Sequence, residues 1–333
     1  MPSYRLPAGG YIELRMDTIT LARHAMATRF ELVLHGDNPT GLRAAGEEAL
    51  DEVDRLENRL SLYRPASEIA QINARAAREA VQVSPELFAL LQQAQKLSQV
   101  TGGAFDITIA PLVRCWGFMG GTGKMTTTEE VAAAREVVGM RNVTLDAAAR
   151  TIRFAREGVM LDLGAIGKGY AVDQAAMILR EAGVTSALVH GGTSTTYAIG
   201  HPPDSNAWKI AIEQAPTAFN PTDFPSMPPI ELRDEALSVS AIWGRAFQAE
   251  GKNFGHVIDP RIGEPVSAAF LTAVILPSAT ETDALSTALM VQGKAGPAMM
   301  SKVCPGAKFS IVSQRDGRYH IESNQQQSKS NTR

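Results

Sequence analysis

Strand-like and helix-like hydrophobic patterns follow one another along this chain of 333 residues without a regular alternation. Arg29–Gly36 alternates apolar and polar residues, which predicts a strand, whereas the apolar residues of Thr40–Tyr63 recur every three or four positions, which predicts a helix. Ala307–Ser323 is typical of a hairpin that turns at Asp316–Gly317. A doubly wound parallel sheet needs strands and helices in strict alternation. We therefore predict an α+β fold with mixed, largely antiparallel sheets and packed helices.

The same signals place further elements and bound the domain. A helix is expected after Ser84, a possible N-cap, and another after one of the threonines 126–128. The apolar run Val159–Leu163 is expected to be a strand that leads into a helix ending at Gly183. Residues 20–323 are predicted to form a single domain, with two lobes as an alternative, and the polar residues 324–333 a disordered tail.

Composition excludes several classes of function. With 44% hydrophobic and 20% charged residues the chain is ordinary for a globular protein, and its net charge of −3 without a basic run gives no reason to expect nucleic acid binding. No stretch of about 18 apolar residues predicts a membrane span. The N-terminal region has no apolar run of signal-peptide length, so we expect a cytoplasmic protein; an exported form would need a further segment. Cys115 and Cys304 are expected to be unpaired thiols.

The segment Gly164-Ala-Ile-Gly-Lys-Gly169 partly matches a phosphate-binding loop. A P-loop has four residues between its glycines and a Ser or Thr after the lysine, whereas here two residues separate Gly164 from Gly167 and Gly169 follows Lys168. Glycines still permit close approach of a backbone, and amides at a helix start favour an anion. The alternative is a glycine-rich turn into a helix with a lysine on the surface.

Three further side chains suggest chemistry. His256 precedes an apolar segment that ends in Asp259-Pro260, so it could accept a proton, although a lone histidine is more often structural. Asp283 and Thr287 lie four residues apart and share a helix face. Both side chains offer oxygen, which suits Mg²⁺, but an acid near a helix start beside a threonine needs no metal to explain it.

Two more segments are ambiguous when read alone. In Leu60–Asn73 one helix ends near Tyr63 and Ser67 is a candidate cap for the next helix. In Thr101–Phe118 paired glycines, a Phe-Asp pair and an aromatic pair suggest a wall for a planar ligand, or equally a tight turn with core aromatic residues.

Taken together, these segments resemble the FAD:protein FMN transferases, the flavin transferases of the ApbE family. The resemblance covers roughly Met26 to Gly293 and rests on joint order and spacing. The matching pieces are MATRFELVL, LSLYRPASEIAQIN, TGGAFDITIAPLVRCWGF, LDLGAIGKGYAVD, HGGTSTTYAIG, FGHVIDPRIGEPV and TETDALSTALMVQG. It implies an ApbE-like fold and an enzyme that uses Mg²⁺, takes FAD as substrate, transfers FMN to a Ser or Thr hydroxyl of an acceptor protein, and releases AMP.

The resemblance also implies roles for individual residues. His256 matches the histidine that activates the acceptor hydroxyl. Asp283, Thr287 and the backbone carbonyl of Ala165 match the metal ligands. The positions that match flavin-nucleotide-binding segments are Tyr63, Ser67, Glu68, Asn73, Thr101, Phe105, Asp106, Lys168, Asp173 and Ser240.

The chain departs from the family pattern at three positions. Ala27 stands where the family usually has glycine, Thr193 where it usually has an acid or amide, and Ala241 where it usually has glycine. Thr193 lacks a charge or acceptor, and Ala241 restricts the approach of a ligand to the backbone. Two alternatives therefore stay open: a flavin-binding protein of this fold without transfer activity, and an FAD pyrophosphatase that gives FMN and AMP.

Overall fold

The computed structural model describes residues 3–5, 11–13, 16–212, 224–249, 251–267, 269–316 and 318–325, and its centre is an eight-stranded sheet. Every neighbouring pair in this sheet is antiparallel. The order across the sheet is β17 (Arg318–Ser323), β16 (Lys308–Arg315), β15 (Ala269–Leu276), β12 (Ala236–Ala241), β9 (Thr195–Ile199), β8 (Ala187–Gly191), β4 (Thr28–Gly36) and β3 (Asp17–Ala25). The predicted α+β class and antiparallel pairing are confirmed.

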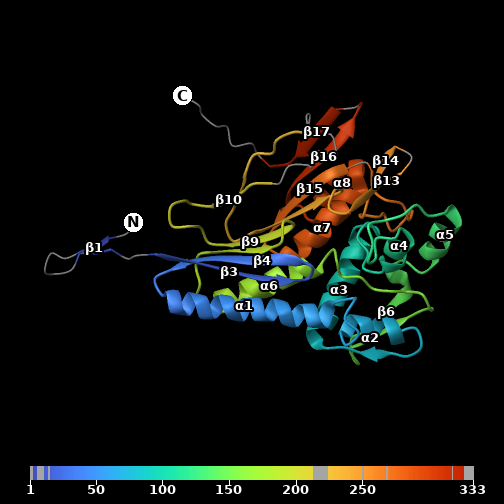
Figure 1. Ribbon diagram of the computed structural model, residues 1–333, viewed down its shortest axis with the longest axis horizontal. Helices are drawn as coiled ribbons and strands as arrows, with labels where there is room; N and C mark the ends of the chain where they lie inside the picture. The colour runs from blue at the N-terminus through green and yellow to red at the C-terminus, as the bar shows by residue number, and fades with distance from the viewer. Residues whose placement is uncertain are drawn as a thin grey trace.

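Three helices pack together along one face of this sheet (Figure 1). They are α1 (Pro39–Leu60), α6 (Gly167–Glu181) and α7 (Ala279–Gln292), and α8 (Gly296–Val303) packs on α7. The opposite face is covered by a small antiparallel pair, β10 (Trp208–Ile210) and β11 (Ile230–Leu232), whose apolar side chains pack on Leu188 and Leu237. The central sheet thus has a buried face on each side.

The remaining elements form a second group beside the ends of these helices (Figure 1). It contains α2 (Glu68–Arg75), α3 (Pro85–Val100), α4 (Ala110–Cys115), α5 (Thr128–Glu136), the short helix Met140–Asn142 and the sheet β5 (Val81–Gln82), β7 (Thr151–Phe154) and β6 (Val143–Asp146). The hairpin β13 (Ala246–Ala249) and β14 (Lys252–Gly255) packs there on Trp116 and Phe118. A separate pair, β1 (Ser3–Arg5) and β2 (Tyr11–Glu13), lies near the N-terminus.

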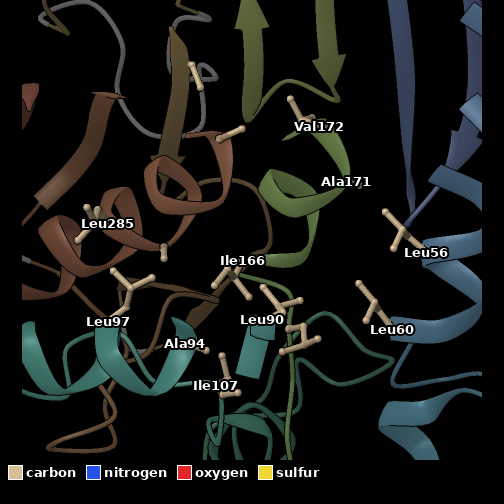
Figure 2. Close-up of a cluster of buried hydrophobic side chains, with 14 of the residues drawn as sticks. Leu56, Leu60, Leu90, Ala94, Leu97, Ile107, Ile166, Ala171, Val172 and Leu285 are labelled. Carbon is tan, nitrogen blue, oxygen red and sulfur yellow. The ribbon is translucent and has the colours of Figure 1, made fainter. Parts of the chain in front are cut away.

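One hydrophobic core joins the two groups of elements. Figure 2 shows Leu90, Ala94 and Leu97 of α3 close to Ile166 and Leu285, while Leu56 and Leu60 of α1 approach from the other side. These side chains are all buried and belong to one cluster. A shared core holds the two groups in a defined relation, which matters because the cavity described below takes residues from both. The predicted domain limits of 20–323 stay a prediction.

Several local predictions are confirmed. β4 and α1 match the expected strand and helix, Thr127 caps α5 in a reciprocal capping box with Glu130, and β16 and β17 form the expected hairpin. Both cysteines are unpaired. The predicted tail lies mostly outside the described residues, which end at position 325. Within the described part, no helix combines the length and apolar character needed to cross a bilayer.

The prediction of a strand at Val159–Leu163 is wrong. The side chains of Val159, Leu161 and Leu163 are buried in alternation, which produced the strand-like pattern, but the segment joins no sheet. Its backbone is held instead by the Asn73 side chain, which accepts from the Leu161 N–H at 2.7 Å and donates to the Leu161 carbonyl at 3.0 Å. A buried extended segment outside a sheet thus shows the same alternation of apolar residues at every second position as a strand.

Helices α6 and α7 cap each other through their own carboxylates. Asp173 on α6 accepts from the backbone N–H groups of Ala279 and Thr280 and from the hydroxyls of Ser278 and Thr280, at 2.6 to 2.9 Å, all at the start of α7. In return Asp283 on α7 accepts from the backbone N–H of Gly169, in the first turn of α6, at 3.0 Å. Each carboxylate satisfies helix-start amides that have no partner within their own helix.

We predict that Asp173→Ala destabilises the protein by about 2–4 kcal/mol, because one substitution leaves several donors at the start of α7 without a partner. Urea unfolding followed by circular dichroism measures this loss. The control is Glu181→Gln at the exposed end of α6, which is expected to change stability by less than about 0.5 kcal/mol. Equal stability of the two variants would contradict the capping role.

Candidate active site

A cavity of about 990 Å³ lies where the second group of elements meets the sheet and helices α6 and α7. Segments that are far apart in the sequence contribute to its wall. The predicted site residues that line it are Tyr63, Phe105, Asp106, Ala165, Lys168, Ser240, His256, Asp283 and Thr287. The fold therefore brings together the predicted proton acceptor, the predicted metal ligands and the lysine of the glycine-rich loop.

Oxygen donors gather at the α6–α7 contact. Asp283 is only 5% exposed, and its Oδ2 takes the Gly169 N–H. Thr287 lies one turn later on α7, and its Oγ1 is 3.4 Å from the Ser240 hydroxyl. Ala165 lines the same cavity on the loop before α6. Carboxylate, hydroxyl and carbonyl oxygens suit a hard cation such as Mg²⁺.

This set of oxygen donors carries little negative charge. Among the described residues no group of three or more His, Cys, Asp or Glu side chains could hold a metal ion. Asp283 is thus the one carboxylate in the set formed by Ala165, Asp283 and Thr287. These residues fit Mg²⁺ in the manner common for nucleotide substrates, in which one or two carboxylates act with phosphate oxygens and water.

The glycine-rich loop has a different internal structure from a P-loop. Lys168 Nζ donates to the Gly164 carbonyl at 3.0 Å, and Asp162 Oδ1 accepts from the Gly164 N–H at 2.8 Å. A Cβ atom on Gly169 would lie 2.2 Å from the Ala279 carbonyl oxygen. Gly169 is therefore required by the close approach of α6 to α7, and this approach is what brings Asp283 to the loop.

The imidazole of His256 is neutral at physiological pH. Burial, together with the positive charges of Arg245 and Lys168, lowers the pKa of His256 to about 4, although a hydrogen bond with the Arg245 backbone acts in the opposite direction. Nδ1 lies 3.3 Å from the backbone nitrogen of Arg245 and 3.2 Å from its carbonyl oxygen. The backbone of Arg245 thus fixes the ring, which is in the state needed to accept a proton.

The other predicted residues do not line the cavity and instead hold its walls. Ser67 caps α2 and donates to the Ser61 carbonyl, and Glu68 accepts from Arg59 and Ser84. Thr101 donates to the Leu97 carbonyl at 2.7 Å.

Asn73 and Asp173 likewise act on the frame, through Leu161 and through the start of α7. Each of these five contacts fixes a segment next to the cavity. A direct flavin contact for any of the five stays a prediction.

Some lining residues carry no strong sequence signal. Asp162 was visible only as an acid at the end of an apolar run, and Arg245 and Trp243 lie in a segment where His256 alone attracted attention. The three departures from the family pattern also lie at the cavity. Ala27 has φ of 58°, a left-handed conformation that favours glycine, which explains why a glycine is usual there.

The chain is similar to named flavin transferases over most of its length. The FAD:protein FMN transferase of Vibrio cholerae is 31% identical over 253 residues, which are 73% of this chain and 73% of the relative. The FAD:protein FMN transferase of Haemophilus influenzae is 29% identical over 286 residues, covering 83% and 81%.

Solved structures give the same result. The crystal structure of the ApbE protein of Thermotoga maritima aligns with a TM-score of 0.82 at 28% identity and covers 92% of this chain and 97% of that one. The apo form of the flavinyl transferase ApbE of Pseudomonas stutzeri aligns with a TM-score of 0.80 at 28% identity, covering 94% and 96%.

The fold is thus that of the flavin transferases, a class of enzymes. The family model described as "ApbE family" matches residues 26–309, which is most of the chain. The protein belongs to the ApbE family, and the resemblance seen in the sequence is confirmed.

We predict that the His256 ring stays neutral in the native protein down to about pH 5. Because its native pKa is lowered from the ordinary 6.5, the unfolded state binds the proton more readily, so His256 contributes stability above pH 6.5 that is lost as the pH falls towards 4. Imidazole ¹⁵N shifts measured by NMR between pH 4 and 8 test this. Titration near 6.5 in both the native and the urea-unfolded protein would contradict it.

Proposed function

We propose that the protein transfers FMN from FAD to a Ser or Thr hydroxyl of an acceptor protein, in a Mg²⁺-dependent reaction that releases AMP. The observation that carries the proposal is the single cavity in which a buried carboxylate at a helix contact, a lysine and a neutral histidine converge. The names of the relatives, FAD:protein FMN transferase, support the same reaction.

Each of these residues has a separate role in the proposed phosphoryl transfer. The acceptor hydroxyl oxygen attacks the phosphorus of the FMN half, a new P–O bond forms, and the bond from that phosphorus to the AMP oxygen breaks. Neutral His256 takes the hydroxyl proton, since a Ser or Thr hydroxyl is a poor nucleophile at neutral pH. Lys168, held at the loop, neutralises charge on the phosphate oxygens.

Asp283, Thr287 and the Ala165 carbonyl would hold Mg²⁺, which when bound supplies further neutralisation of negative charge on the phosphates. The one-carboxylate donor set leaves room for phosphate oxygens as ligands. The contact between Ser240 and Thr287 helps to orient the Thr287 hydroxyl.

Thr193 and Ala241 line the cavity, so the two alternatives deserve a direct test. AMP released from FAD only when an acceptor is present, together with an FMN-labelled acceptor, would support transfer. AMP formed at the same rate without an acceptor would indicate a pyrophosphatase, and flavin binding without AMP would indicate a binding protein.

We predict that Asp283→Asn lowers the rate of FMN transfer by roughly 100-fold or more, because it removes the one charged donor of the metal site. The amide oxygen of Asn can still accept the Gly169 N–H, so the α6–α7 contact is kept. In-gel flavin fluorescence of the acceptor and chromatography of AMP measure the rate.

The matched control is Glu281→Gln, which removes a carboxylate from the same helix outside the cavity. Its rate is expected to stay within about twofold of the parent, as is typical of a substitution away from the site. Full activity of Asp283→Asn, or an equal loss in the control, would contradict the proposed metal site.

A further inference from the structure

Arg245 lines the cavity close to His256 and is exposed there. The contact with His256 is made by the Arg245 backbone, whose N–H and carbonyl lie 3.3 and 3.2 Å from Nδ1. The Arg245 side chain therefore takes no part in this contact with the imidazole. Its guanidinium donates one hydrogen bond, from Nη1 to the Phe118 carbonyl at 3.2 Å, and a guanidinium has five N–H donors to offer.

The carboxylates that line the cavity are already engaged elsewhere. Glu57 pairs with Arg64 at 2.7 Å, and Asp106 accepts from the Thr108 and Met140 N–H groups. Asp162 and Asp283 accept from loop and helix amides. Within the described residues, neither Arg245 nor Lys168 forms an ion pair with any of them.

Within the described residues, Arg245 and Lys168 thus line one cavity without a carboxylate partner, and both positive charges act on the His256 imidazole. Such an arrangement disfavours a protonated His256 as long as the cavity holds no anion. An anion bound in the cavity near both cations would offset their effect and make proton transfer to His256 more favourable. Two cations in one cavity therefore favour a ligand that carries more than one negative charge.

We propose that the Arg245 guanidinium, in the same cavity as Lys168, binds the diphosphate of the flavin dinucleotide and so acts as a substrate-binding residue. This inference rests on the proposed function, because the diphosphate is the multivalent anion of that reaction. A planar guanidinium matches phosphate oxygens with two parallel hydrogen bonds, whereas Lys168 offers a point charge. The hydrogen bond to the Phe118 carbonyl orients the Arg245 guanidinium. Phe118 belongs to the aromatic cluster that packs against the β13–β14 hairpin.

The test compares a ligand that has the diphosphate with one that has no phosphate. FAD and riboflavin are titrated onto the protein in EDTA, with flavin fluorescence as the signal, so the result does not depend on a metal. Arg245→Ala is expected to weaken FAD binding about 10- to 100-fold, since charge-assisted hydrogen bonds are lost, and to leave riboflavin binding within about twofold. Arg245→Lys should fall between the parent and Arg245→Ala for FAD.

Lys252→Ala is the matched control, since it removes a positive charge from the same hairpin at an exposed position outside the cavity. It should bind both ligands as the parent does. Equal weakening of FAD and riboflavin by Arg245→Ala would show that the side chain merely supports the hairpin, and unchanged FAD binding would also overturn the inference.

The FMN-transfer assay of the parent protein separates this inference from the proposed function. The parent protein could fail to label the acceptor while Arg245→Ala weakens the binding of FAD but not of riboflavin. The proposed transfer reaction would then be wrong, and the contact between Arg245 and the phosphates would stand. If the parent transfers FMN and Arg245→Ala does not weaken FAD binding more than riboflavin binding, the transfer reaction stands and the proposed role of Arg245 is wrong.

Discussion

The mutual capping of α6 and α7 is the interaction on which the site depends. Asp173 binds the start of α7, and Asp283 binds the start of α6, so hydrogen bonds in both directions hold the two helices in their relative position. Gly169 makes this possible, because a Cβ atom there would overlap the Ala279 carbonyl. This mutual capping costs little stability, since the amides at a helix start need hydrogen-bond acceptors in any case. Its result is that a carboxylate stays buried beside a glycine-rich loop, with one of its oxygens committed to the fold.

The cavity joins this helix pair to the hairpin that carries His256. The hairpin is positioned by aromatic contacts, since Phe254 stacks 5.9 Å from Trp116 and Phe247 lies 5.8 Å from Phe118. The Trp116 indole in turn donates to the Gly263 carbonyl. The loop that carries Lys168 is positioned instead by Asn73 and by the core around Ile166 (Figure 2). The packing of the hairpin and the packing of the loop together set the distance between His256 and the oxygen donors, so no single element contains the site.

Local patterns predicted the elements well and their connections poorly. Hydrophobic periods and capping residues identified β4, α1, α5 and the last hairpin, because these depend on neighbours in sequence. The Val159–Leu163 segment was misread because alternate burial does not reveal whether backbone groups bond to a strand or to Asn73. The motif order identified the residues of the cavity, but it could not separate Asp173, which caps a helix start 106 residues away, from Lys168, which faces the ligand space.

Burial and nearby charge determine the protonation state of His256, the proposed base. Burial and two nearby cations keep His256 neutral, which secures the acceptor state but makes the ring a weak base. Among the residues that the structure describes, the same cations have no carboxylate partner, because each carboxylate of the cavity is bound to another group. In the proposed reaction, an anionic substrate bound near these cations would raise the basicity of the ring. Proton transfer to His256 would then be more favourable after the substrate has bound than before it.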